Sequence, residues 1–238
     1  MRYTDWTDEL ATLQDLRSDT FVGDADTPQP VCNLILALAL VYNDFKDNIM
    51  ASMLLGDVAP DGDEAARTPQ RGMFNAHVMV TVRIRLGLFH ELFALIKKHE
   101  PVTNEPAFLR TVNRLHPNRR SHWSALKNVA LEQPSSSDFA KFLVMLRNTV
   151  VFHYDPQVIF RGYRRLFIDD QSQAPAVSLG DTMAETRFYF ADAAAQDYVV
   201  HGSQTQDLIT ILGARGEIVR WTNDALNGIV TEFIKSRQ

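Results

Sequence analysis

Helical periodicity is the sequence feature that most limits the fold of this chain. Apolar residues recur three or four positions apart along most segments, whereas the alternation of apolar and polar residues expected of strands is nearly absent. Two helix starts are marked clearly, because Thr68-Pro69 and Asp155-Pro156 each place a capping side chain before a proline at the first helical position. The pattern predicts an all-α fold.

Clusters of Pro, Gly, Asn and Ser divide this pattern into separate helices. Two serine-led capping pairs, Ser135 with Asp138 and Ser203 with Gln206, predict further helix starts, and Thr7 can cap the first helix. The expected helices cover about 7–18, 31–55, 69–98, 105–115 and 119–131, a helix from Ser135 to about 153, a helix that begins at 156, and one or two helices that end near 237.

The stretch 169–190 interrupts the helical pattern. Its first part, up to about residue 186, is expected to be irregular, and the RFYF sequence at 187–190 could form one short strand. No internal repeat, low-complexity tract or linker divides the chain. The sequence therefore predicts a single domain over residues 1–238.

Composition excludes several classes of protein. Of the 238 residues, 45% are hydrophobic, which supports a sizeable core, and the formal net charge of -5 does not indicate a general nucleic-acid binder. Cys32 is the only cysteine, so an internal disulfide and a multi-cysteine metal cluster are excluded. Neither a secretory signal nor a membrane-spanning stretch of about 20 apolar residues is recognisable. We expect a cytoplasmic protein that does not enter a membrane and uses no cofactor.

The segment MLRNTVVFHYDPQ carries the residues best suited to chemistry. Arg147 and Asn148 lie within its apolar run, and His153, Tyr154 and Asp155 close that run. Arginine presents a permanently charged planar fork to phosphate oxygens, asparagine adds a neutral donor and acceptor, and histidine titrates near neutral pH. Together these side chains could hold and protonate a phosphodiester.

Geometry sets a condition on this site. Arg147 and His153 are six residues apart, so on one straight helix they lie about 120° apart and about 9 Å along the axis. A shared site would need converging long side chains, a kink, or a second copy of the motif across a symmetric interface.

The Arg-Asn pair followed by His153 resembles the R-x4-6-H motif of HEPN domains, as found in abortive-infection and toxin-antitoxin proteins. The resemblance implies a HEPN-like helical bundle with additional helices, with a core that includes about 69–168. It also implies a dimer whose two motifs meet at a cleft and cut RNA without a metal. Arg147 would then bind the scissile phosphate, Asn148 would orient the phosphate or Arg147, and His153 would act as acid or base.

The leading hypothesis is a metal-independent endoribonuclease that uses the RNA 2′-hydroxyl, in a toxin or anti-phage role, with RNA, an antitoxin protein and a second copy as partners. One alternative is a noncatalytic HEPN-like module that binds RNA, a nucleotide or a partner protein. Another is an unrelated helical protein in which Arg147 pairs with Asp155 and His153 caps its helix.

Basic residues after the motif extend the hypothesis. Arg161, Arg164 and Arg165 share one helix face and, with Tyr154, are expected to contact substrate; the alternative is a solvated face balanced by nearby aspartates. Arg85 falls on the apolar face of its helix, so it should meet a carboxylate, backbone carbonyls or an interface.

Overall fold

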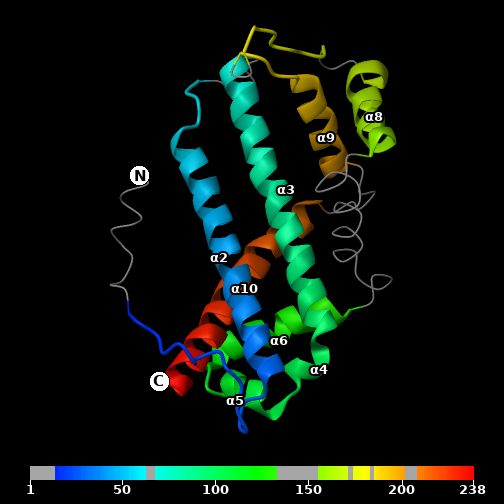
Figure 1. The fold of residues 1–238 in the computed structure, drawn as a ribbon. Helices are drawn as coiled ribbons and strands as arrows, with labels where there is room; N and C mark the ends of the chain where they lie inside the picture. Colours follow the sequence, from blue (N-terminus) through cyan, green and yellow to red (C-terminus); the bar gives the residue numbers. More distant parts are fainter. Residues whose placement is uncertain (1–13, 63–67, 133–154, 171–173, 183–184, 202–207) are drawn as a thin grey trace. The chain divides into compact units, whose positions relative to one another are not determined.

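The protein is all-α. The computed structural model (Figure 1) describes residues 14–62, 68–132, 155–170, 174–182, 185–201 and 208–238, with side chains except at 199–201 and 208–216. Its helices are α2 (Gln29–Asp57), α3 (Pro69–Lys98), α4 (Glu100–Thr103), α5 (Pro106–Asn113), α6 (Pro117–Leu131), α8 (Pro156–Arg164), the π-helical turn η2 (Arg165–Asp169), α9 (Tyr189–His201) and α10 (Leu208–Arg237). Within these residues, no helix is both long and apolar enough to cross a membrane.

The chain forms two compact units, and the long helices α2 and α3 contribute to both. Unit 1 contains the described residues of 48–87 and 155–208, and unit 2 contains those of 14–47, 88–132 and 209–238. The expectation of a single domain over residues 1–238 with a HEPN-like core stays a prediction.

Unit 2 holds the largest buried side chains among the described residues. They recur three or four positions apart on the facing sides of its helices, which is why each helix buries one stripe. Aromatic rings join neighbouring helices: Phe45 of α2 lies 4.7 Å from Phe89 of α3, and Phe108 of α5 lies 5.4 Å from Trp123 of α6, between ring centroids. The fully buried set includes Val31, Ile35, Leu38, Phe89, Leu92, Ile96, Phe108, Leu126, Leu226, Ile229 and Phe233.

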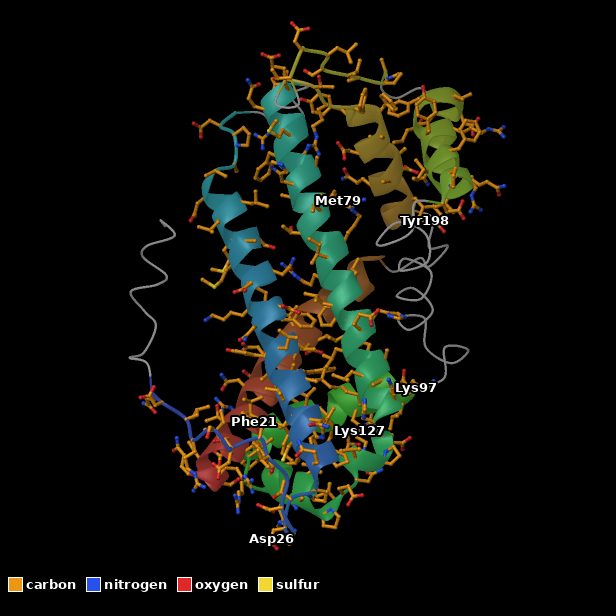
Figure 2. The ribbon with its side chains drawn as sticks, in the orientation of Figure 1. Phe21, Asp26, Met79, Lys97, Lys127 and Tyr198 are labelled. Carbon is orange, nitrogen blue, oxygen red and sulfur yellow. The ribbon has the colours of Figure 1, made fainter. Side chains whose placement is uncertain are left out.

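The N-terminal loop, residues 14–28, belongs to unit 2 and attaches to the end of α10. The ring of Phe21, labelled in Figure 2, lies 5.5 Å from that of Phe233. The expected first helix is wrong for residues 14–18, which form loop and turn; its cap, Thr7, lies outside the described residues. Local hydrogen bonds form a turn at this point, because the amide and the hydroxyl of Thr20 both donate to the carbonyl of Arg17, at 3.1 and 2.7 Å.

In unit 1, α8 packs directly on α9, and the two helices lie side by side in Figure 1. Their backbones approach closely at Gly162, where an added Cβ would lie 2.1 Å from the carbonyl oxygen of Ala194. Tyr189, the first residue of α9, donates from its hydroxyl to the carbonyl of Pro69, 3.1 Å away, which ties the start of α9 to the start of α3.

Two predicted helix starts are confirmed. The hydroxyl of Thr68 accepts from the amide of Arg71 at 3.2 Å and α3 begins at Pro69, while the Asp155 carboxylate caps α8, which begins at Pro156. The strand expected at 187–190 is wrong. The backbone of Arg187 pairs with that of Ser178 in an isolated bridge. Helix α9 begins two residues later, within the same four-residue stretch.

Candidate nucleic-acid interface

The residues of the sequence motif fall outside the part of the chain that the structure describes. Arg147, Asn148, His153 and Tyr154 all lie within 133–154, as do the expected Ser135 and Asp138 pair. Their convergence on a common site therefore stays a prediction. The described chain resumes at the next residue.

Asp155 is the described residue that adjoins the motif. Its Oδ1 accepts from the amide of Gln157 at 2.9 Å and from that of Val158 at 3.3 Å, which satisfies two amides that the helix itself leaves unpaired. This cap occupies one carboxylate oxygen of Asp155. Helix α8 therefore follows the motif directly in the sequence, with Asp155 as its N-cap.

Arg165 is held by a buried carboxylate. Its guanidinium binds Asp197 of α9 through two nitrogens, with Nε 2.9 Å from Oδ2 and the second nitrogen bonded to Oδ1. The Asp197 side chain is 5% exposed, whereas that of Arg165 is 42% exposed. This pair joins η2 to α9, and release of Arg165 to bind a phosphate would separate a buried carboxylate from this guanidinium.

The other two arginines of this face are more available to an anion. Arg164 contacts Asp169 at 3.4 Å, and both side chains are more than half exposed, so solvent weakens the pair. Arg161 lies over the ring of Tyr198, labelled in Figure 2, with 5.8 Å from its guanidinium carbon to the ring centroid. Among the described residues, no carboxylate pairs with Arg161. The arginines predicted to act together thus differ in what they already bind.

Aromatic rings of α8, η2 and the start of α9 form a connected series, which we call the aromatic row. Phe160 stacks on Tyr163 at 6.4 Å and 12°, and Tyr163 contacts both Phe167 and Phe190 at 4.9 and 6.1 Å. Phe188 continues the row at 6.0 Å from Phe190. The two end rings, those of Phe160 and Phe188, are 56% and 53% exposed. Surface rings of this kind can stack on bases or on apolar side chains.

Sequence reasoning missed this row and the carboxylate partner of Arg165. The helical spacing of Phe160, Tyr163 and Phe167 was a usable signal, because residues three and four apart share a face. Phe188 and Phe190 gave no such signal, since they precede or begin a helix that the sequence did not predict. Asp197 lies 32 residues from Arg165, so spacing along the chain could not reveal the pair.

Arg85 meets polar groups that carry no charge. Its Nε donates to Oδ1 of Asn48 at 2.9 Å, and a second nitrogen lies 2.5 Å from the hydroxyl of Ser52. Asn48 in turn donates to the carbonyl of Thr81 at 3.0 Å, so these bonds join α2 to α3 within unit 1. Partial burial lowers the pKa of Arg85 from its usual value. Arg85 is thus bonded to polar groups, but these are a side-chain amide and a hydroxyl and not the carboxylate, backbone carbonyls or interface that the sequence predicted.

Histidine and carboxylate side chains meet at two places in unit 2. Nδ1 of His90 lies 3.2 Å from Oε1 of its neighbour Glu91 on α3, and the other pair joins α6 to α10. Nδ1 of His122 lies 3.1 Å from Oδ2 of Asp224, at ion-pair distance but without hydrogen-bond geometry. No group of three or more His, Cys, Asp or Glu side chains in the described ranges is placed to share a metal ion.

Comparison with known proteins adds no relative. The chain matches no family model, and no curated protein or solved structure is significantly similar to it. The HEPN resemblance therefore depends on the motif and on the all-α fold.

Proposed function

We propose that this protein is a metal-independent endoribonuclease of the HEPN type. The observation that carries the proposal is Arg147-Asn148 followed by His153, placed directly before the capped start of α8 in an all-α chain. In this proposal the protein acts in the cytoplasm as a homodimer, as a toxin or anti-phage effector, and an antitoxin protein restrains it.

The proposed chemistry needs few groups. RNA supplies its own nucleophile, so His153 of one copy removes the 2′-hydroxyl proton and that of the other protonates the 5′-oxygen as it leaves. Arg147 stabilises the charge that develops on the phosphate oxygens, and Asn148 holds the phosphate in place. The products are an RNA ending in a 2′,3′-cyclic phosphate and an RNA beginning with a 5′-hydroxyl.

The test compares four purified proteins on labelled RNA in the presence of EDTA. Wild type should cleave, whereas His153→Ala should be slower by about 100-fold or more and Arg147→Ala by a similar factor. His77→Ala is the matched control, because His77 is an exposed histidine of α3 remote in sequence from the motif, and it should leave the rate unchanged. Cleavage that EDTA abolishes, or that persists in His153→Ala, would refute the mechanism.

A noncatalytic binding module is the second candidate, and the aromatic row favours it. The two exposed end rings, and Arg161 elsewhere on α8 without a described carboxylate partner, could bind RNA or a partner protein without any reaction. RNA that stays intact but binds, with weaker binding by Phe160→Ala and not by His153→Ala, would support this candidate over the nuclease.

A further inference from the structure

Unit 2 contains a cavity lined by three arginines. The cavity has a volume of about 320 Å³, and its lining residues include Arg110, Arg114, Arg237, Asp24, Asp26 and Ser236. We call it the arginine pocket. It lies between the N-terminal loop, α5 and the end of α10, all of which belong to unit 2.

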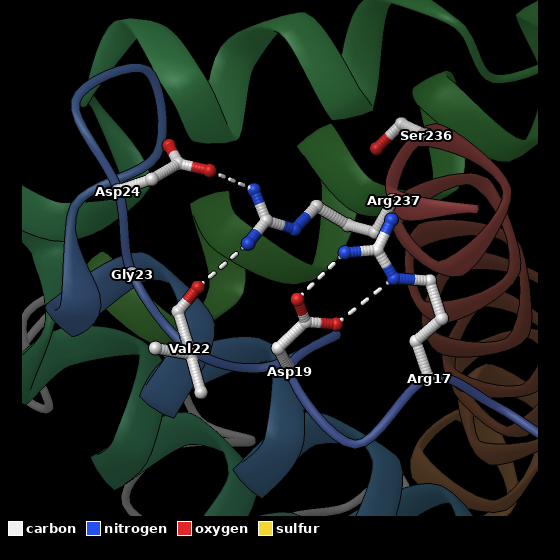
Figure 3. A pocket seen from close by; sticks show the side chains of 7 residues that line it. All are labelled: Arg17, Asp19, Val22, Gly23, Asp24, Ser236 and Arg237. Atoms are coloured by element: carbon white, nitrogen blue, oxygen red, sulfur yellow. Dashed lines mark hydrogen bonds and ion pairs between the residues drawn. The ribbon is translucent and has the colours of Figure 1, made fainter.

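Arg237 is a fixed wall of this pocket. Its Nε donates to the carbonyl of Thr20 at 3.2 Å, one terminal nitrogen donates to the carbonyl of Val22 at 2.6 Å, and the other binds Asp24. Figure 3 shows the last two contacts, on the side where Arg237 also borders a neighbouring cavity. In that cavity Arg17 and Asp19 pair with each other, so their charges are already balanced.

Asp24 is committed to Arg237 and to the turn that it caps. The Arg237 guanidinium, together with the amides of Thr27 and Asp26, holds the pKa of the Asp24 carboxyl below its usual value of 3.8. The charge of Asp24 is therefore present at neutral pH and is balanced by Arg237 of α10. It is not available to balance the arginines at the end of α5.

Arg110 of α5 and Arg114, which directly follows the last residue of α5, are not balanced in this way. They are four residues apart, so they lie on the same side of the helix, where like charges repel. Arg110 donates to the backbone carbonyl of Asp26 at 2.5 Å, and the side chain of Arg114 has no hydrogen-bond or ion-pair partner among the described residues. The Asp26 side chain is exposed. Three arginines thus line the pocket with two carboxylates, of which that of Asp24 is already paired with Arg237 and that of Asp26 is exposed to solvent.

We propose that the arginine pocket binds the phosphate group of a small phosphomonoester, with Arg110 and Arg114 as its main contacts. Guanidinium groups from successive turns present paired N–H donors that match phosphate oxygens, and a doubly charged phosphate offsets the repulsion between them. The cavity is near the lower end of the range for small-molecule sites and larger than a phosphate ion needs, so it has room for an attached organic group.

Arg114 gives the cleanest test, because its side chain has no described bond whose loss would disturb the fold. Binding of phenyl phosphate to the full chain is measured by calorimetry, with benzoate and sulfate as comparison anions and with ionic strength held constant by NaCl. We expect phenyl phosphate to bind wild type more tightly than either comparison anion. Arg114→Ala should weaken that binding about tenfold, as loss of a charged hydrogen bond predicts.

The matched control is Arg120→Ala, which removes an exposed arginine of α6 that does not border the pocket. It should bind phenyl phosphate as wild type does. Equal losses in the two variants would mean a general effect of net charge and would overturn the proposal. So would benzoate binding as tightly as phenyl phosphate, or no binding of phenyl phosphate to wild type. None of these outcomes depends on RNA cleavage.

Discussion

Replacing Gly162 by alanine tests how closely α8 packs on α9, because two physical effects predict opposite changes in stability. By helix propensity alone, alanine in a helix interior is more favourable than glycine by about 1 kcal/mol. In this structure, however, the new Cβ would lie 2.1 Å from the carbonyl oxygen of Ala194 and 3.0 Å from its carbonyl carbon. Ordinary carbon to oxygen contacts are about 3.3 Å, so the helices must separate by about 1 Å.

The sign of the net effect follows from what blocks the methyl group. Ala194 presents backbone, which cannot rotate away as a side chain can, so we expect the upper end of the range for overpacking, about 3 kcal/mol. Subtracting the gain in helix propensity leaves a net loss of about 2 kcal/mol in the free energy of unfolding of unit 1. Gly162 is thus required by the helix contact despite its low propensity.

Hydrogen exchange followed by mass spectrometry is the suitable assay, because it reports on the α8 and α9 amides separately from unit 2. Exchange of these amides should accelerate in Gly162→Ala. The control is Gly56→Ala near the end of α2, where an added Cβ would meet no atom within 4 Å and should stabilise its helix by about 0.5 kcal/mol. If both variants slowed exchange in their own helices, the close approach of α8 and α9 would be refuted.

Three further changes probe the described contacts. Asn48→Ala removes the buried amide that bonds α2 to α3, so it should lower the free energy of unfolding, measured by urea denaturation, by about 2 kcal/mol. The control Asn43→Ala, at an exposed position of the same helix, should change this free energy little. Arg165→Ala should destabilise α9 and accelerate the hydrogen exchange of its amides. Arg161→Ala should weaken RNA binding and leave the hydrogen exchange of α9 unchanged. The opposite result would mean that Arg161 holds α9 and Arg165 binds RNA. Folding lowers the pKa of Asp24, so the bond between Asp24 and α10 stabilises the folded protein at neutral pH. This stabilisation is lost as the pH falls through the lowered pKa. Amides of the N-terminal loop should therefore exchange faster below about pH 4 once the intrinsic rate is allowed for, and Asp24→Asn should remove this dependence.

Local signals predicted the helices well where a few neighbouring residues decide the structure. Thr68 and Asp155 cap the helices that follow them, and proline at the next position already has the required backbone angle. The same reasoning failed at residues 187–190, where aromatic residues favour a strand locally. There, packing of Phe190 on Tyr163 and the alanine-rich sequence that follows favour the start of α9 instead.

The candidate site could be predicted from sequence only in part. The spacing of Arg147 and His153 suggested a chemistry, and their residues lie outside the described ranges, so that suggestion stays a prediction. For the arginines after the motif, sequence gave the face and the charge. It could not give Asp197 as the partner of Arg165, because that contact depends on how α9 folds back onto α8 and η2.

The state of each arginine is what turns a basic residue into evidence about a ligand. Arg165 and Arg237 are each held by a carboxylate, so replacing either acts first on the fold. Arg161 and Arg114 have no carboxylate partner in the described parts of the chain, so an anion can bind them without first breaking an ion pair. If that reasoning is correct, replacing Arg161 and Arg114 by alanine should reduce the salt dependence of anion binding and leave the unfolding transition unchanged. Replacing Arg165 or Arg237 should instead shift the unfolding transition, with a smaller effect on binding.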